Sequence, residues 1–179
     1  AEAGLTIEGA WKHILSSGWW PYVVSGTMYP TIGGAAAMNI HGKNNFRVGT
    51  FGDHVREFDL VLSSGEVRTA NREQNSDLFH AAIGGFGSLG VFSRIVMDTK
   101  RVHSGLMEVR GVSTHDLAEM MAVFEAEKAA ADYLVGWIDA FPGGDRSGRG
   151  LVHVGRNLGP GEDTASSDSL DPAAQSLPA

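Results

Sequence analysis

His41 and Lys43 are the residues of this 179-residue chain best suited to chemistry, because they flank Gly42 inside a glycine- and alanine-rich stretch, Gly26–His54. An imidazole can exchange a proton near neutral pH, and an ammonium group supplies a positive charge. Runs of glycine and alanine bury little apolar area, so they suit a backbone that passes close to a flat or phosphate-bearing ligand. The same composition also fits a surface loop between two strands, in which His41 would only bond nearby backbone groups.

The sequence lacks the residue patterns of several other chemistries. It has no cysteine, which excludes disulfides, Cys-ligated zinc, iron–sulfur clusters and a thiol nucleophile. Its seven histidines show no metal-ligand spacing, so we expect no metal site. Gly42-Lys43 is followed by Asn44 and lacks the upstream glycine of a P-loop, and there is no G-x-S-x-G nucleophile elbow. Hydrolysis and phosphoryl transfer therefore have little support.

The composition is that of a globular protein. Apolar residues make up 42% and charged residues 20% of the chain, and the formal net charge of −7 argues against nucleic acid as a partner. No apolar run is long enough for a membrane span, and the absence of cysteine fits a reducing, cytoplasmic location. The first residues lack an initiator Met and begin in mid-pattern, so we expect a piece of a longer protein. Nothing in the composition indicates an oligomeric state.

Short elements are expected around the glycine-rich stretch. Thr6 is suited to cap a half-buried helix that ends at Gly18, and the bulky segment 19–24 should be extended. Runs 55–62 and 66–70 predict two strands joined by a loop that contains Gly65. Asn75 or Ser76 should begin a short helix, followed by the glycine cluster 84–90 and a strand at 91–98.

The cluster 84–90 contains Gly85-x-Gly87-x-x-Gly90, which matches the dinucleotide-binding fingerprint as a string. That fingerprint needs a strand before it and a helix after it, so that a pyrophosphate meets a helix N-terminus. Here a helix is expected before the cluster and a strand after it. A Rossmann fold is therefore rejected.

The second half of the chain predicts a β-α-β-β unit. A polar joint at 99–105 should lead to a strand at 106–112, and Ser113-Thr-His-Asp116 resembles a capping box. The following helix carries a stripe of core residues, and strands are expected at 133–140 and 150–156, separated by a turn at 142–148. Residues 159–179 should form a disordered tail. The stripe consists of Leu117, Met120, Met121 and Phe124.

Several motifs in this order resemble the FAD-binding oxidoreductases of the vanillyl-alcohol-oxidase (PCMH) type. The similar segments cover roughly residues 1–100. They are Gly26-Thr27, Thr31-Ile-Gly-Gly34, Ala37-Met-Asn-Ile-His-Gly-Lys-Asn44, Gly49-Thr-Phe-Gly-Asp-His-Val55, Asn75-Ser-Asp-Leu-Phe79 and Ile83-Gly-Gly-x-Gly-x-x-Gly-Val91. The His-Gly-Lys-Asn element is most similar to the decaprenylphosphoryl-ribose oxidase branch.

The resemblance implies an α+β fold: the second half of a PCMH-type FAD-binding domain, mostly antiparallel sheet with flanking helices, followed by an incomplete β-α-β-β substrate (cap) domain. The implied division is 1–100 for the FAD domain, 101–158 for the start of the substrate domain and 159–179 for the tail. The family's first glycine-rich pyrophosphate loop and the C-terminal part of its substrate domain have no counterpart here. The chain thus resembles a fragment that is inactive alone, and covalent attachment of the flavin cannot be read from it.

The resemblance also implies the site residues. Backbone N–H groups around Thr31-Ile-Gly-Gly34 would meet the FAD pyrophosphate, and the segment at Gly90 and Val91 would lie near the adenosine. His41 and Lys43 would face the flavin and the substrate as catalytic residues, with Lys43 and Trp137 on the substrate side. The implied cofactor contacts are Gly26, Thr31, Ile32, Gly33, Gly34, Met38, Asn39, Ile40, His41, Val91 and Phe92.

The activity that follows from this resemblance is hydride exchange between FAD and a small sugar- or lipid-like substrate, by oxidation of a C–OH or reduction of a C=C bond. The alternative is a truncated, non-catalytic remnant that serves as a binding or interaction module. Its motivation is the unfinished second sheet, whose apolar faces would stay exposed.

Overall fold

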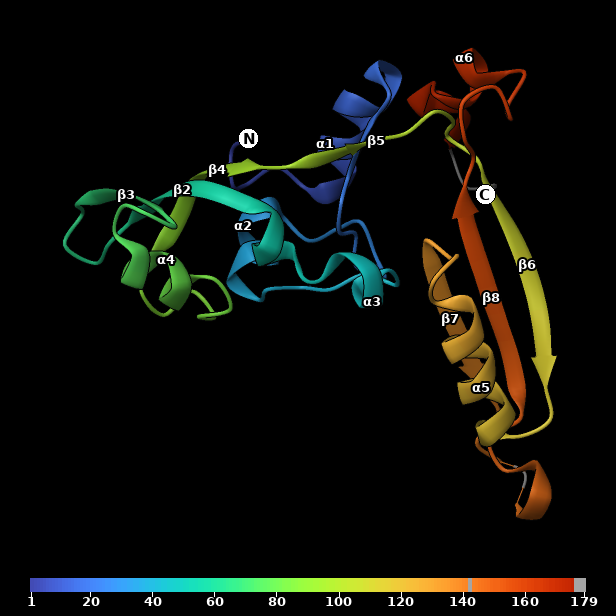
Figure 1. Cartoon of the computed structure of the whole chain (residues 1–179). Coiled ribbons are helices and arrows are strands. Elements are labelled where there is room, and N and C mark those ends of the chain that lie inside the picture. The colour runs from blue at the N-terminus through green and yellow to red at the C-terminus, as the bar shows by residue number, and fades with distance from the viewer. Residues whose placement is uncertain (142, 176–179) are drawn as a thin grey trace. The chain divides into compact units, whose positions relative to one another are not determined.

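The computed structural model describes residues 1–141 and 143–175, which form two compact units. The first comprises Ala1–Arg101 together with the segment that begins at Leu170, and the second comprises Val102–Ser169. Both combine antiparallel sheets with helices, so the expected α+β class is confirmed (Figure 1). The helices and strands of the first unit are α1 (Ile7–Ile14), β1 (Trp19–Pro21), α2 (Ile32–Ala37), α3 (Asn45–Val48), β2 (Val55–Val61), β3 (Val67–Asn71), α4 (Ser76–Ala82), β4 (Val91–Met97) and β5 (Thr99–Arg101).

Helix α1 follows its sequence prediction. The Thr6 side chain accepts a hydrogen bond from the Gly9 N–H, and Gly18 ends the following 3-10 turn in the left-handed region with φ 76°. Segment 19–24 was expected to be extended, and only its first three residues form a strand, β1. Strand β1 pairs with β5, which lies within the predicted polar joint at 99–105. That joint was predicted wrongly as non-strand, because its pairing partner lies far away in the sequence.

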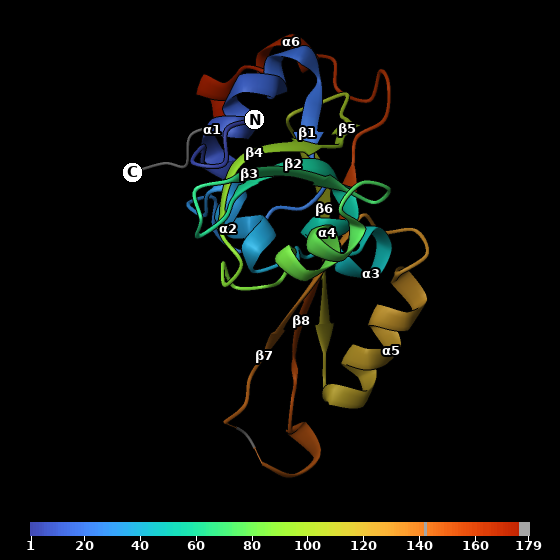
Figure 2. The same cartoon turned by 90° about the vertical axis from the view of Figure 1, so that its left-hand side faces the viewer.

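The central sheet has the order β3-β2-β4, and both pairings are antiparallel. Figures 1 and 2 show α2 and α4 on the same side of this sheet. On that side Phe58 packs between two other rings, stacked on Phe79 at 5.4 Å and edge-on to Phe92 at 4.8 Å between ring centroids. Aromatic pairs of this geometry add to the free energy of area burial. Because successive side chains of β2 point to opposite faces of the sheet, one face supplies the core residues against which both helices pack.

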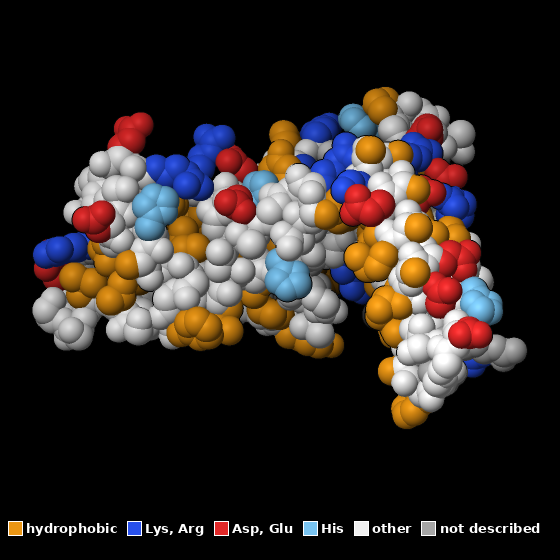
Figure 3. Space-filling model, turned by 60° about the horizontal axis from the view of Figure 1, so that its bottom comes forward, with side chains coloured by type: hydrophobic (Ala, Val, Ile, Leu, Met, Phe, Trp, Pro, Cys, Tyr) orange, Lys and Arg blue, Asp and Glu red, His pale blue; other side chains and the backbone are white. Residues whose placement is uncertain are grey.

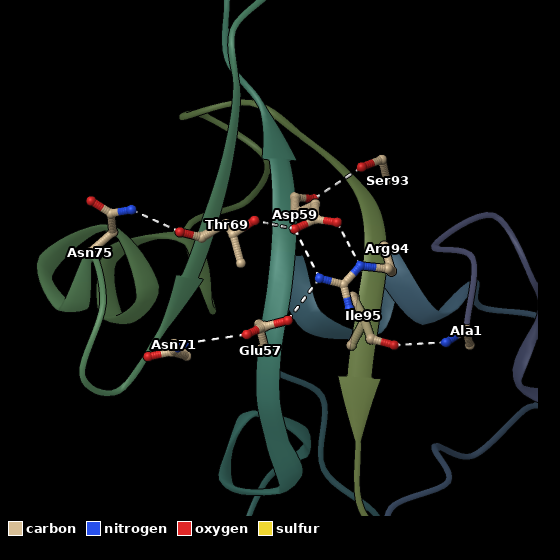
Figure 4. Close-up of polar contacts among 9 residues, drawn as sticks. All are labelled: Ala1, Glu57, Asp59, Thr69, Asn71, Asn75, Ser93, Arg94 and Ile95. Atoms are coloured by element: carbon tan, nitrogen blue, oxygen red, sulfur yellow. Dashed lines mark hydrogen bonds and ion pairs between the residues drawn. The ribbon is translucent and has the colours of Figure 1, made fainter.

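The opposite side of the sheet is polar and centred on Arg94, as Figure 4 shows. The guanidinium donates to Asp59 at 2.6 Å and to Glu57 at 2.7 Å. These hydrogen bonds lower the pKa of both carboxyl groups below their ordinary values and raise that of Arg94. Beside them the N-terminal ammonium of Ala1 donates to the Ile95 carbonyl at 2.8 Å, which fixes the first residues along β4.

The second unit is the predicted β-α-β-β arrangement, with a sheet of order β6-β8-β7. Its core consists of Met120, Ala131, Leu134 and Val152. Of the expected helix stripe, Met120 is buried and Phe124 packs against this core, whereas Leu117 and Met121 are exposed. The elements are β6 (Met107–Thr114), α5 (Leu117–Glu127), β7 (Tyr133–Ile138), β8 (Gly150–Asn157) and α6 (Ser166–Ser169).

The N-terminus of α5 differs from the prediction in its capping residues. Asp116 is the N-cap and accepts from the Glu119 N–H at 2.8 Å, while the Glu119 carboxylate accepts from the His115 N–H at 2.6 Å. The expected box of Ser113 with Asp116 is therefore shifted by three residues toward the C-terminus. Asp116 takes the cap because strand β6 continues through Thr114.

Residues 159–175 differ from the disordered tail that composition predicts. Ser104 and Ser169 both donate hydrogen bonds to the Asp163 carboxylate, and Arg156 pairs with Glu162 at 2.7 Å. Short polar side chains here replace the apolar contacts whose absence suggested disorder. Residues 176–179 of the predicted tail and residue 142 of the predicted turn lie outside the described residues.

Candidate functional site

A glycine-lined hollow of about 340 Å³ lies within the first unit, where the start of α2, the N-terminal segment and the start of β4 meet. Five residues predicted to contact a cofactor line it together. Five small residues that the prediction did not list as cofactor contacts also line it. The predicted five are Thr31, Gly33, Gly34, Val91 and Phe92, and the others are Ala3, Gly4, Ala37, Gly87 and Gly90.

Helix α2 was not predicted, because its two glycines disfavour a helix and its six residues are too few to show a helical pattern of large apolar side chains. It forms because Thr31 caps it and because Ile32, Ala35 and Ala36 are fully buried. Gly33 is required by close packing, since an added Cβ would lie 3.0 Å from the Cβ of Ala3. Tertiary contacts thus outweigh local propensity in this segment.

The backbone N–H groups at the start of α2 already have acceptors. Ile32 donates to the Leu5 carbonyl and Gly33 to the Ala3 carbonyl, both at 2.8 Å, and Gly34 donates to the Thr31 hydroxyl at 3.0 Å. The structure thus leaves none of these three amides unpaired for the pyrophosphate that the resemblance placed there. The N-terminal segment that occupies them carried no recognisable signal in the sequence.

Other glycine amides of the hollow are unpaired. The N–H groups of Gly4, Gly87 and Gly90 have no acceptor among the described residues, and a Cβ added to Gly4 or Gly87 would have no atom within 4 Å. Gly87 has φ 72°, which favours glycine at this turn. Gly4 and Gly87 therefore border open space, whereas Gly90 packs against the Val61 carbonyl. Unpaired glycine amides of this kind can donate to a ligand's oxygen atoms.

The second glycine cluster is attached to the end of α2. Gly84 donates to the Ala36 carbonyl at 3.0 Å, and Phe86 donates to the Ala37 carbonyl at 2.9 Å. These bonds satisfy C-terminal carbonyls of α2. Helix α4 precedes the cluster and β4 follows it, so the rejection of a Rossmann arrangement is confirmed.

The His41–Asn44 segment is fixed at both ends. His41 forms a β-bridge with Thr50, and the buried Asn44 side chain donates to the Tyr22 carbonyl at 2.8 Å. Gly42 is buried against Val24, where an added Cβ would lie 2.8 Å from the Val24 carbonyl oxygen. The His41 and Lys43 side chains are exposed and make no polar contact within the described residues, so both can reach a ligand.

The remaining predicted cofactor residues lie elsewhere in the first unit. Asn39 borders a smaller hollow of about 180 Å³, where its side-chain oxygen accepts from the Gly52 N–H at 2.8 Å. Gly26 borders a third hollow of about 700 Å³ beside Trp11. The Met38 side chain is 53% exposed. The Ile40 carbonyl accepts a hydrogen bond from the Phe51 N–H at 2.8 Å. The predicted set is therefore divided among separate surfaces.

Trp137, predicted on the substrate side, belongs to β7 of the second unit. Its side chain is 62% exposed. Strand register places it opposite Leu151 of β8, on the face of the sheet that α5 leaves open. Its contact with a substrate stays a prediction.

Comparison with known proteins gives the family. The family described as "FAD binding domain" matches residues 1–71. Decaprenylphosphoryl-beta-D-ribose oxidase of Mycolicibacterium smegmatis is 34% identical over 157 residues, which cover 86% of this chain and 34% of that protein. The chain belongs to the PCMH-type FAD-binding oxidoreductases. Their cofactor is FAD.

Two further relatives illustrate how much of a PCMH-type protein is present. An uncharacterized protein in the mprA 5′ region of Streptomyces coelicolor is 29% identical over 83% of this chain and 40% of its own length. Cytokinin dehydrogenase 2 of Arabidopsis thaliana is 30% identical over 62% of this chain and 23% of its own length. The chain thus spans between about a quarter and two fifths of these relatives. These similarities favour an enzyme family over the non-catalytic module.

The residues of the glycine-lined hollow fit part of FAD. Glycines without Cβ atoms and unpaired amides suit phosphate oxygens, and the exposed Val91, 70% accessible, offers apolar area to a flat ring.

In the described part of the chain, no group of His, Asp or Glu side chains is arranged to hold a metal. No helix among residues 1–141 and 143–175 combines the length and the apolar character that a membrane crossing requires.

Proposed function

We propose that this chain is part of an FAD-dependent oxidoreductase that exchanges a hydride between the flavin and a sugar- or lipid-like substrate. The observation that carries the proposal is the glycine-lined hollow, with the unpaired amides of Gly4, Gly87 and Gly90. The similarity to an oxidase over 86% of the chain supports it. The substrate class and the direction of the reaction are part of the proposal.

The residues divide into binding and catalytic roles. Gly87 and Gly90 donate to the diphosphate, and Val91 contacts the adenosine part. FAD, when bound, supplies the ring that takes up or delivers the hydride. His41 orients and polarises the substrate oxygen through a hydrogen bond, and Lys43 attracts an anionic group of the substrate. The β-bridge of His41 to Thr50 and the buried Asn44 hold the intervening backbone still, which limits the entropy lost on binding.

FAD binding by the 179-residue chain tests the cofactor assignment. Saturation-transfer NMR detects weak complexes, so it suits a chain that holds only part of the site. We expect transfer to the adenosine protons of FAD and competition by ADP but not by riboflavin. Val91→Asp should abolish the transfer, whereas Val67→Asp should preserve it, because Val67 is similarly exposed and does not line the hollow. Absence of transfer, or equal loss in both variants, would contradict the assignment.

Activity requires a second experiment. A chimera can join this chain to the N-terminal half of the FAD domain and the C-terminal part of the substrate domain of the mycobacterial relative. The absorption spectrum of the purified chimera is then recorded. Flavin bands at about 370 and about 450 nm are expected, followed by bleaching when a sugar or lipid substrate reduces the flavin. A folded chimera that binds FAD and is never reduced by such substrates would leave the cofactor site intact and refute the proposed reaction.

A further inference from the structure

Asn39 joins the end of α2 to the segment that carries His41. It follows the C-cap Met38 and has φ 44°, in the left-handed region. Helices commonly end at a residue of this conformation, and asparagine adopts it more readily than most other side chains. The direction in which the chain leaves α2 toward His41 therefore depends on Asn39.

The side chain of Asn39 bonds to the 3-10 turn Phe51–His54. Its Oδ1 accepts a hydrogen bond from the Gly52 N–H at 2.8 Å. Gly52 is buried, and within the described residues its N–H has no other acceptor. A Cβ added to Gly52 would lie 2.9 Å from the same Oδ1, so the close approach requires glycine. The bond thus depends on both residues.

This bond extends a short antiparallel ladder that reaches His41. His41 forms a β-bridge with Thr50. One residue earlier in the chain, the Ile40 carbonyl accepts from the Phe51 N–H at 2.8 Å. The Asn39 side chain continues the same register by one more step. Because Phe51 is only 1% exposed, the middle of the ladder is anchored in the core, and its two ends set the path of the His41 backbone.

The opposite side of the ladder is held by its own contacts. The Asp53 carboxylate accepts from the Thr50 N–H at 2.7 Å and from the Thr50 hydroxyl at 2.9 Å. These hydrogen bonds lower the pKa of the Asp53 carboxyl below its ordinary value. The Arg72 guanidinium donates to the Gly52 carbonyl at 3.4 Å. Asn39 therefore connects the His41 segment to a turn that is already fixed.

We infer that Asn39 is a positioning residue for His41 and does not itself contact the cofactor. The inference rests on the proposed function, in which His41 bonds the substrate oxygen. Asn39 lines the hollow of about 180 Å³ and does not line the glycine-lined one. The His41 side chain is exposed, and Figure 3 shows histidine side chains at the surface of this unit. The position of His41 thus depends on its backbone, and a shift of about 1 Å can lower a rate about a hundredfold.

Three variants separate the side-chain bond from the backbone conformation. Asn39→Gly keeps the left-handed backbone and removes the acceptor. Asn39→Asp keeps both, because a carboxylate oxygen can accept from the Gly52 N–H and aspartate tolerates this conformation. Asn75→Gly is the matched control. Asn75 has φ 50°, and its side chain donates to the Thr69 carbonyl at 2.7 Å, as Figure 4 shows.

NMR of the 179-residue chain tests the position of His41 without cofactor or activity. We expect nuclear Overhauser contacts between His41 and Thr50, lost in Asn39→Gly and retained in Asn39→Asp and Asn75→Gly. The Gly52 amide should exchange with solvent roughly tenfold faster in Asn39→Gly, the scale of losing one hydrogen bond. Contacts between His41 and Thr50 that persist unchanged in Asn39→Gly overturn the inference.

Kinetics of the chimera test the consequence for the reaction. Asn39→Gly should lower kcat about tenfold, while KM and FAD content stay within about twofold. Asn39→Asp should restore kcat, and Asn75→Gly should leave it unchanged. Release of FAD by Asn39→Gly would make Asn39 a cofactor contact, and an unchanged kcat would likewise overturn the inference. If no substrate reduces the unsubstituted chimera, the proposed reaction is refuted, and the contacts between His41 and Thr50 still decide the role of Asn39.

Discussion

The backbone N–H of Gly84 donates to the carbonyl oxygen of Ala36 at 3.0 Å, and this bond joins the two glycine-rich motifs of the chain. One motif supplies helix α2, and the other supplies the loop that leads into β4. Their union produces the hollow in which Gly33, Gly34, Gly87 and Gly90 lie together. The glycines are therefore needed for the packing of the site as well as for access to it.

Gly85→Ala should destabilise the first unit. A Cβ at this position would clash with the carbonyl oxygen of Ala81, a backbone atom that cannot move without disturbing α4. We expect a loss of about 1–3 kcal/mol in the free energy of unfolding, measured with urea. Gly26→Ala is the matched control, since an added Cβ there has no atom within 4 Å. Equal stabilities of the two variants would show that the loop accommodates the methyl group.

Asn44→Ala should cost about 1–3 kcal/mol of unfolding free energy, because it leaves the Tyr22 carbonyl without its donor. Asn44→Asp should cost more, since a carboxylate at this buried position cannot donate to that carbonyl. Asn45→Ala, at the exposed neighbouring residue, should change stability by less than about 0.5 kcal/mol. If Asn44→Ala and Asn45→Ala melt alike, Asn44 does not hold the His41–Asn44 segment in place.

Acid should destabilise the first unit through the Arg94 cluster. The pKa of the Asp59 carboxyl is lowered from 3.8 in the folded state by hydrogen bonds from Arg94 and Thr69. A lowered carboxyl pKa stabilises the fold above the unfolded-state pKa, and this contribution is lost as the pH falls through the folded-state value. Urea unfolding should therefore show stability declining below about pH 4. Arg94→Met should flatten this decline, and an unchanged pH profile in that variant would exclude the cluster as its source.

His41 and Lys43 should separate in kinetics, measured in the chimera that carries a complete FAD domain. His41→Ala should lower kcat by roughly tenfold or more while FAD stays bound, the scale of losing a positioned polar group. Lys43→Ala should mainly raise KM, because its charge contributes to substrate affinity. If His41→Ala left kcat unchanged and released FAD, His41 would be a cofactor-packing residue instead.

The sequence by itself determined the elements whose signals are local. Thr6 and Gly18 marked the ends of the first helical segment, Gly65 marked the β2–β3 hairpin, and alternation along β2 gave its buried face. Each depends on side chains within a few residues of one another, so periodicity and capping rules suffice. The ordered motifs between Gly26 and Val91 likewise sufficed for the family and its cofactor.

Only the tertiary structure decided which backbone groups of the site are available. Helix α2 forms despite its two glycines because it is buried, and its first amides are paired by Ala3 and Leu5. Strand β5 exists because β1 lies beside it, and Asp163 is ordered by Ser104. In each case the partner is distant in sequence. A hydrogen bond or packing contact between distant segments depends on how the whole chain folds, and no local pattern encodes it.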